Sequence, residues 1–515
     1  MSSTDRSFGA NATVSVFGWA VPALAALVAI PITVNGLGAD QYGLLALTTV
    51  LTGYLGLMQM GLGGALVRYL AFYRALDEGR PMIGILFFGL KWFLIAGLIG
   101  GVFMWFAAPW LSSTVLKVPP ELQQTSITVM RLTGVNFALA LLVSVGTAIP
   151  QSFLRYDIAS LMSGIIGTAS VAGPAIIVTL GYELVPVVVF GLVLNAAALA
   201  AYAIVGLGLM RLVRRDAGPY WKEIRRKTLS FAGLTAVNSI GNTVTVQTSG
   251  LVVGIAGGVA DAAYYQVPYT LASRINDMLS RVAQVLFPTA SGLLARDARA
   301  AVQDLYIRAS RLFFVLNFSV TMGLCVMAYP LLQFWVSDKY AKEGAVALII
   351  FSLAGSLHAT TMAASYINLS AARPGINVVF SNVANVINLA TVYPLTVWLG
   401  VEGAALSGLI AALNVPFFVA YGNKHVLSLS TWVVWLKCYQ PTIIGTLIVG
   451  VASYFLLRPL ASGLVLTLFL WGITVLLAIV VSGFLGAIRR EDVDTARRLM
   501  GSAYSRLRSS SRQSS

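Results

Sequence analysis

The chain has 515 residues, of which 58% are hydrophobic and only 10% are charged. Soluble domains usually carry roughly 25% charged residues, so this composition excludes a sizeable soluble domain. The formal net charge is +15, but most of the cations flank apolar segments, so no nucleic-acid partner is expected.

Fourteen apolar segments follow one another along the chain, and each is long enough to cross a bilayer once. An α-helix rises 1.5 Å per residue and the hydrocarbon layer is ~30 Å thick, so about 20 apolar residues form one span. The predicted spans are residues 12–34, 42–66, 83–108, 126–149, 158–180, 184–210, 229–256, 262–288, 310–335, 345–369, 375–398, 401–422, 437–457 and 463–485. No small-residue cleavage site follows the first segment, so we interpret it as a span and not as a signal peptide. The sequence therefore predicts an all-α polytopic membrane protein.

Lys and Arg are distributed unequally between the two sides of these spans. One side carries 26 of the 34 basic residues, including the run from Arg211 to Lys227, whereas the other carries 4. Cytoplasmic loops retain positive charge, so both termini are predicted to lie in the cytoplasm. The remaining basic residues, Lys91, Arg131, Arg274 and Arg281, fall inside predicted spans.

Loop signatures recur at a nearly constant interval and indicate an internal duplication. Positions of similar character are separated by 218 to 221 residues: Asp40 and Asp261, Pro109 and Pro330, Arg155 and Arg373, and Glu183 and Glu402. Each copy contains an even number of spans, so both enter the membrane from the same side. Such copies form a parallel pseudo-twofold repeat, with substrate sites expected between the two lobes near the midplane.

The duplication predicts the domain organisation. Spans thirteen and fourteen have no counterpart in the repeat, so they are read as an addition to two six-helix lobes. The predicted parts are a cytoplasmic N-terminus (1–11), a first lobe (12–210), a basic connector (211–228), a second lobe (229–422), the two extra spans with the preceding loop (423–485) and a basic cytoplasmic tail (486–515).

Two glycine-rich runs, Gly36 to Leu44 and Gly61 to Arg68, resemble the opening of polysaccharide transporters. These are the Wzx-type lipid-linked oligosaccharide flippases of the multidrug/oligosaccharidyl-lipid/polysaccharide (MOP) exporter superfamily, and the resemblance extends from about Ala12 to Leu485 in span number and repeat. It implies a MATE-like fold that works by alternating access. The implied cargo is an undecaprenyl-diphosphate-linked oligosaccharide, moved from the cytoplasmic to the periplasmic leaflet of a bacterial inner membrane. The implied partners are membrane lipids and the polymerase and glycosyltransferases of an envelope polysaccharide pathway.

The strongest candidate binding residues are three charges in the eighth predicted span. Arg274, Asp277 and Arg281 are spaced i, i+3 and i+7, which places them on one helical face. A charge at the bilayer centre costs roughly 2.5 to 3.5 kcal/mol on insertion scales, so this face should meet a partner or a wet cavity. In the functional interpretation the two arginines attract the diphosphate or acidic sugars and Asp277 holds their side chains. The alternative is an ion-pair ladder that fixes the helix against a neighbour.

Further candidates each have a structural alternative. Lys91 and Arg131 could line the cavity or extend to the head groups, and Arg68 could receive cargo or act as a topogenic anchor. Intramembrane amides could bind sugar hydroxyls or join helices; they are Asn382, Asn385, Asn388, Asn238, Asn242 and Gln247. His358, also inside a span, is interpreted as a packing residue.

Other function classes are less well supported by these residues. A drug or cation antiporter of the same superfamily would carry a cation that Arg274 and Arg281 repel, whereas a lipid II flippase would differ only in the transported lipid. An enzyme is not expected, because the longest periplasmic loop has about 17 residues and no catalytic constellation is present. The motif from Asp492 to Asp494 is read as part of a cytoplasmic surface helix. No cofactor or metal is expected, and a proton or sodium gradient is the candidate energy source.

Overall fold

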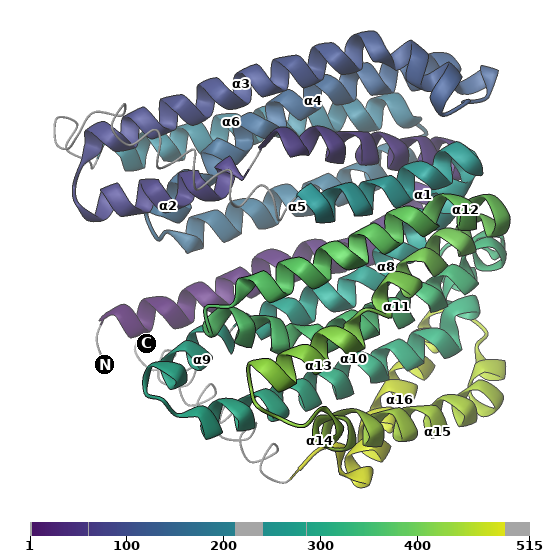
Figure 1. Cartoon of the computed structure of the whole chain (residues 1–515). Helices are drawn as coiled ribbons and strands as arrows, with labels where there is room; N and C mark the ends of the chain where they lie inside the picture. Colours follow the sequence, from purple (N-terminus) through teal and green to yellow (C-terminus); the bar gives the residue numbers. More distant parts are fainter. Residues whose placement is uncertain (1–2, 60, 212–239, 285, 490–515) are drawn as a thin grey trace, which may run out of the picture. The chain divides into compact units, whose positions relative to one another are not determined.

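The computed structural model describes residues 3–59, 61–211, 240–284 and 286–489, and those ranges contain helices and no strand. Figure 1 draws the helices in chain order. The longer helices are α1 (Ser3–Leu55), α2 (Leu62–Ala75), α3 (Gly79–Trp110), α4 (Pro120–Ser152), α5 (Tyr156–Thr179), α6 (Leu184–Met210), α8 (Val259–Ala283), α9 (Leu286–Ala295), α10 (Arg299–Trp335), α11 (Asp338–Ser370), α12 (Pro374–Ala412), α13 (Val415–His425), α15 (Gln440–Leu456) and α16 (Leu464–Ser482). Residues 240–256 are also helical. Short helical segments are η1 (Gly56–Gln59), η2 (Leu111–Val115), α14 (Thr431–Val434), η3 (Trp435–Tyr439), η4 (Arg458–Leu460) and η5 (Gly483–Ala487).

The prediction of an all-α, multi-pass membrane protein is confirmed. Within the described residues, 10 helical segments are long and apolar enough to cross a membrane. Two of these, Val21–Gln59 and Pro374–His425, each contain two predicted spans, because the helix continues through Gly38 and Gly400 with a kink. The polar α8 is not among the 10, and the predicted span 229–256 lies partly outside the described residues. The number fourteen therefore stays a prediction.

The duplication inferred from the loops reappears in the backbone. Four pairs of residues with left-handed φ recur 218 to 220 positions apart; they are Gly38 and Gly258, Asp77 and Asp297, Leu154 and Ala372, and Gly181 and Gly400. Their turns also share hydrogen bonds: Arg155 N donates to Pro150 O and Arg373 N donates to Asn368 O, both at 2.9 Å. Left-handed φ is uncommon for residues other than glycine, so such agreement supports the duplication independently of sequence similarity.

Two compact units divide the chain differently from the predicted lobes. Unit 1 comprises Met1–Gln266 and Leu389–Ala404, and unit 2 comprises Val267–Asn388 and Ala405–Ser515. The division falls inside α8 and α12, whereas most of the predicted connector 211–228 and the tail beyond residue 489 lie outside the described residues. The predicted lobe boundaries are therefore untested.

Unit 1 extends beyond residue 228 because the helix at 240–256 packs on α1. The Tyr54 and Thr248 hydroxyls are 2.6 Å apart. A side chain at Gly254 would collide with Leu47, and one at Gly43 would collide with the carbonyl of Val259. Small residues in membrane helices allow such close approach of two backbones.

The glycine-rich run Gly36 to Leu44 also supplies a cap for a distant helix. The Leu184 amide, at the buried start of α6, donates to Gln41 Oε1 at 3.1 Å, whereas the preceding Glu183 makes no side-chain cap. The first amides of a helix have no partner within the helix, so a buried one needs an outside acceptor.

We expect Gln41→Leu to lower the apparent melting temperature of the purified protein. The substitution leaves the buried Leu184 amide without its acceptor, which costs about 1–3 kcal/mol. Gln41→Glu, which keeps a carboxylate oxygen in place, is the matched control and should melt close to wild type. Equal melting temperatures for the Leu and Glu variants would show that the cap contributes nothing.

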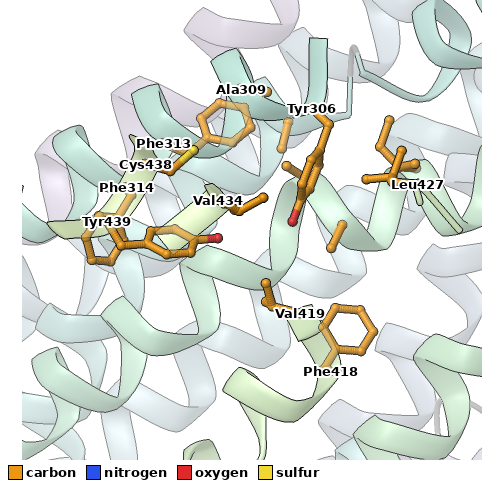
Figure 2. Packing of buried hydrophobic residues seen from close by; sticks show 14 of the residues in the cluster. Tyr306, Ala309, Phe313, Phe314, Phe418, Val419, Leu427, Val434, Cys438 and Tyr439 are labelled. Carbon is orange, nitrogen blue, oxygen red and sulfur yellow. The ribbon is translucent and has the colours of Figure 1, made fainter. Parts of the chain in front are cut away.

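The core of unit 2 gathers apolar side chains from α8, α9, α10, α11, α13, α14 and η3 (Figure 2). Phe314 stacks on Phe318 and meets the edge of Tyr439. Tyr306 is fully buried, and its hydroxyl and that of Tyr439 are directed toward the same region beside Val434. This core fixes the first half of α10 and thereby the helices packed on it.

Candidate functional site

The three predicted charges of α8 lie on one exposed face of that helix in unit 2. Arg274, Asp277 and Arg281 are all exposed, together with Met278 and Val282. The opposite face is buried at Ala272, Leu279 and Ala283, which are 4%, 8% and 0% exposed. We call the exposed set Arg274, Asp277, Met278, Arg281 and Val282 the charged face of α8.

Contacts with α10 and α11 orient this helix. Tyr269 of α8 meets Phe351 of α11 edge to face, with ring centroids 5.4 Å apart. Asn276 Oδ1 accepts a hydrogen bond of 3.1 Å from Asn317 Nδ2 of α10. These contacts involve the side of α8 away from the charged face. Tyr269 and Asn276 therefore orient α8 in unit 2 from the side opposite the charged face. The ion-pair alternative for the charged face itself stays a prediction.

An exposed charged face is unfavourable against acyl chains. Insertion scales assign about 2.5–3.5 kcal/mol to each Arg or Asp at a helix centre, so three such residues together disfavour contact with lipid strongly. Water or polar cargo is the environment that suits them. Two arginines and one aspartate leave one net positive charge, which attracts an anionic group such as a diphosphate.

The helix that carries the charged face is interrupted at its C-terminal end, and so is its counterpart in the first repeat. Helix α8 ends at Ala283 and α9 begins at Leu286, while α1 ends at Leu55 and α2 begins at Leu62 after the short η1 segment. Broken helices at corresponding positions of two repeats often mark the substrate site of a transporter.

Lys91 lies on a different kind of surface. It is exposed on α3 at the spacing of the exposed apolar residues Phe87, Leu94, Ile95 and Leu98. A continuous apolar stripe of this kind suits acyl chains, and a lysine on it can extend its ammonium group to the head groups. This placement favours the second of the two interpretations of Lys91.

We expect Lys91→Leu to leave transport nearly unchanged, because an exposed substitution of this kind alters free energies by about 0.5 kcal/mol or less. For the export that the resemblance to polysaccharide transporters implies, the measurement is surface polysaccharide from cells that carry the variant as their only copy, normalised to protein abundance. A large loss of polymer at wild-type abundance would instead place Lys91 in the path of the substrate.

Arg131 and Arg68 both contact aromatic rings. Arg131 Nε donates to Trp105 O at 3.3 Å, and its guanidinium lies 5.0 Å from the centroid of the Trp105 ring. Arg68 is exposed on α2, with its guanidinium 5.6 Å from the Tyr69 ring. Cation–π contact is typical of basic residues at membrane surfaces, and it leaves the cargo-binding role of both residues as a prediction.

The predicted amides occupy several environments. Asn382 is exposed and donates to Val378 O of its own helix at 2.9 Å, whereas Asn385 is half-buried. Asn388 is buried and donates to Ser407 Oγ at 3.2 Å. Gln247 packs against Gly53, and Asn238 lies outside the described residues. Asn388 therefore has a structural hydrogen bond, whereas Asn382 and Asn242 are the exposed amides of this group.

Two buried features were not predicted from the sequence. Arg311, counted among the cytoplasmic charges, is only 2% exposed, and Asn317 is 1% exposed. Asn317 and Thr321, one turn apart in the predicted span 310–335, were a signal that could have been used. His358 differs from its prediction as a packing residue, since it is exposed, with Nδ1 3.1 Å from Ala354 O.

The sequence matches a known family over more than half its length. The profile described as "Polysaccharide biosynthesis protein" matches residues 37–345. A protein of Shigella flexneri named for O-antigen transport is 19% identical over 333 residues, which are 64% of this chain and 77% of that protein.

Solved structures share the fold. The lipid II flippase MurJ in an inward closed conformation superposes with a TM-score of 0.71 at 13% identity, covering 93% of this chain and 99% of the other. An inward-facing multidrug resistance MATE family transporter of the MOP superfamily gives a TM-score of 0.65 at 16% identity, covering 80% and 98%. The predicted MATE-like fold is confirmed, and at these identities the likeness concerns the fold alone.

Proposed function

Because the chain belongs to the polysaccharide biosynthesis protein family, we propose that it is a flippase for an undecaprenyl-diphosphate-linked oligosaccharide. The repeat unit moves from the cytoplasmic to the periplasmic leaflet of the bacterial inner membrane, for O-antigen, capsule or exopolysaccharide. The observation that carries this proposal is the charged face of α8, with Arg274 and Arg281 exposed within a predicted membrane span. The relative named for O-antigen transport supports the same cargo class.

The transport step requires no covalent chemistry. The protein has to shelter a polar, anionic head group while the polyprenyl tail stays in the bilayer. Arg274 and Arg281 offer charge-assisted hydrogen bonds to diphosphate oxygens, and Asp277 limits the mobility of the two guanidinium groups. Alternating access of the two lobes, driven by a proton or sodium gradient, exposes this face first to one side of the membrane and then to the other. Both termini lie in the cytoplasm in this scheme, where the glycosyltransferases act, and the polymerase receives the product.

The fold neighbours define two competing functions. A lipid II flippase shares the MurJ-like fold and the diphosphate anchor, so it differs only in the sugar that is carried. A MATE-like drug antiporter shares the fold but carries lipophilic cations, which a net positive face repels. The oligosaccharide flippase is therefore the preferred proposal, and the enzyme class is set aside because the relatives are named as transporters and flippases.

The test is a strain that lacks this chain, complemented with the wild-type sequence or with an empty vector. Surface polysaccharide should be lost without the chain, and lipid-linked repeat units should accumulate on the cytoplasmic face of the membrane. Normal polymer in the deletion strain would reject the proposal in favour of drug antiport, which drug-susceptibility measurements on the same strain would detect. Lysis of the deletion strain with accumulation of lipid II would indicate the lipid II flippase.

A further inference from the structure

A hydrogen bond between a half-buried and a fully buried amide connects α8 to α10 within unit 2. Asn276 Oδ1 accepts from Asn317 Nδ2 at 3.1 Å, and Asn317 is 1% exposed. Asn276 lies between Ala272 and Leu279 on the buried face of α8. It is therefore directed away from the charged face, although its sequence neighbour Asp277 belongs to that face.

The same amides extend the contact to α11. Thr321, 3% exposed, places its hydroxyl 3.5 Å from both Asn317 Oδ1 and Ser352 O. On α11, Gly355 leaves room for the Asn276 amide, because a Cβ there would lie 2.4 Å from Asn276 Nδ2. Asn276 thus fits a notch in α11 while it bonds to α10.

Around Asn276, apolar contacts alone define the rotation of α8 about its axis poorly. Between residues 270 and 283 of α8 the fully buried apolar residues are Ala272, Leu279 and Ala283, and two of these are alanines, which bury little area. In a membrane, moreover, apolar side chains gain little by leaving lipid, so helix orientation depends on close packing and hydrogen bonds. Beside the ring contact of Tyr269 with Phe351, the amide pair is a directional contact in this segment.

We propose that Asn276 and Asn317 are positioning residues that set the rotation of α8 and so present Arg274 and Arg281 on the exposed face. A helix turns about 100° per residue, so a modest rotation would move Arg274 toward the apolar neighbours of α8. The consequence for transport rests on the function proposed above, whereas the orientation of α8 does not.

The rotation can be measured without any transport assay. Single cysteines replace Met278, which is 56% exposed, or Leu279, which is 8% exposed. The reaction rate of each with a small charged methanethiosulfonate reagent is measured on purified protein in nanodiscs. Rates are corrected with protein that keeps only Cys325 and Cys438. In the parent, position 278 should react faster than position 279.

Asn317→Leu and Asn276→Ala should each reduce the ratio of these two rates by about threefold, the factor that corresponds to an average interhelical hydrogen bond in a membrane. The double variant should give no larger change than either single variant, because both remove one and the same bond. Asn368→Leu is the matched control, since Asn368 is also 1% exposed but donates to Asn377 Oδ1; it should leave the ratio unchanged.

An unchanged ratio in folded Asn276→Ala protein overturns the proposal, and so does an equal fall in the Asn368→Leu control. Asn276→Ala removes the amide without adding side-chain volume, so it keeps the test valid if Asn317→Leu does not fold. Polysaccharide export by the same variants separates the two proposals. A reduced ratio with normal export would uphold the positioning role and count against the charged face as the cargo site.

Discussion

Replacing Arg274 and Arg281 together with alanine is expected to abolish most polysaccharide export while the protein remains in the membrane. Each arginine offers charge-assisted hydrogen bonds worth about 1.5–3 kcal/mol, and each 1.4 kcal/mol corresponds to about a tenfold change in affinity. Both side chains are exposed on α8, whereas the packing of the helix uses the opposite face. The loss should therefore be one of transport and not of stability. Polymer and lipid-linked intermediates, assayed in the complemented deletion strain, measure it.

The matched control removes the same amount of charge elsewhere. Arg155 and Arg299 pair with Asp157 and Asp297 at the protein surface, with side-chain exposures of 51% and 83%. Exposed pairs of this kind contribute about 0–1 kcal/mol, so the double alanine variant of Arg155 and Arg299 should export normally. Full export by the Arg274 and Arg281 variant would leave the flippase proposal standing but would reject the charged face as its cargo-binding site. Equal loss in both variants would point to net charge and not to a site.

Helix content and membrane passage could be predicted from the sequence because both depend on composition averaged over about 20 residues. The repeat was predictable for a different reason, since its turns need residues with unusual backbone conformations. Gly181 and Gly400 adopt φ of +85° and +61° at equivalent positions, and glycine does this at no steric cost. Span boundaries were harder to predict from the sequence, because a kinked helix such as α12 joins two predicted spans without a break in its backbone.

The charged face was predicted because i, i+3 and i+7 spacing is a property of one helix. The contact that orients α8 could not be predicted in the same way, because the partner of Asn276 lies 41 residues away on α10. The same limit applies to Lys91: its depth in the membrane follows from the sequence, but the apolar stripe around it is visible only once burial is known. Gln41 likewise belongs to a glycine-rich run that the sequence singled out, although its cap on α6, 143 residues away, depends on tertiary structure.

The contact between α3 and α4 should be a sensitive packing contact in unit 1. The two helices lie side by side (Figure 1), and Gly97 and Gly101 of α3 face Ala138 and Gly134 of α4. A Cβ on Gly97 would lie 2.8 Å from Ala138 Cα, which is backbone and cannot swing away. Gly97→Leu must therefore push the helices apart, at a cost of about 1–3 kcal/mol or more for overpacking.

We expect Gly97→Leu to reduce the amount of folded protein in the membrane and to lower its apparent melting temperature, measured by fluorescence-detected size exclusion after heating. Gly472→Leu is the matched control, because Gly472 lies inside α16 with nothing within 4 Å of its virtual Cβ. Leucine also has the higher helix propensity, so this control should be tolerated or slightly stabilised. If both variants lose stability equally, the loss is caused by placing leucine in a membrane helix and not by the contact between α3 and α4. A selective loss at Gly97 would establish that close backbone approach, as in small-x-x-x-small helix pairs, holds this part of unit 1 together.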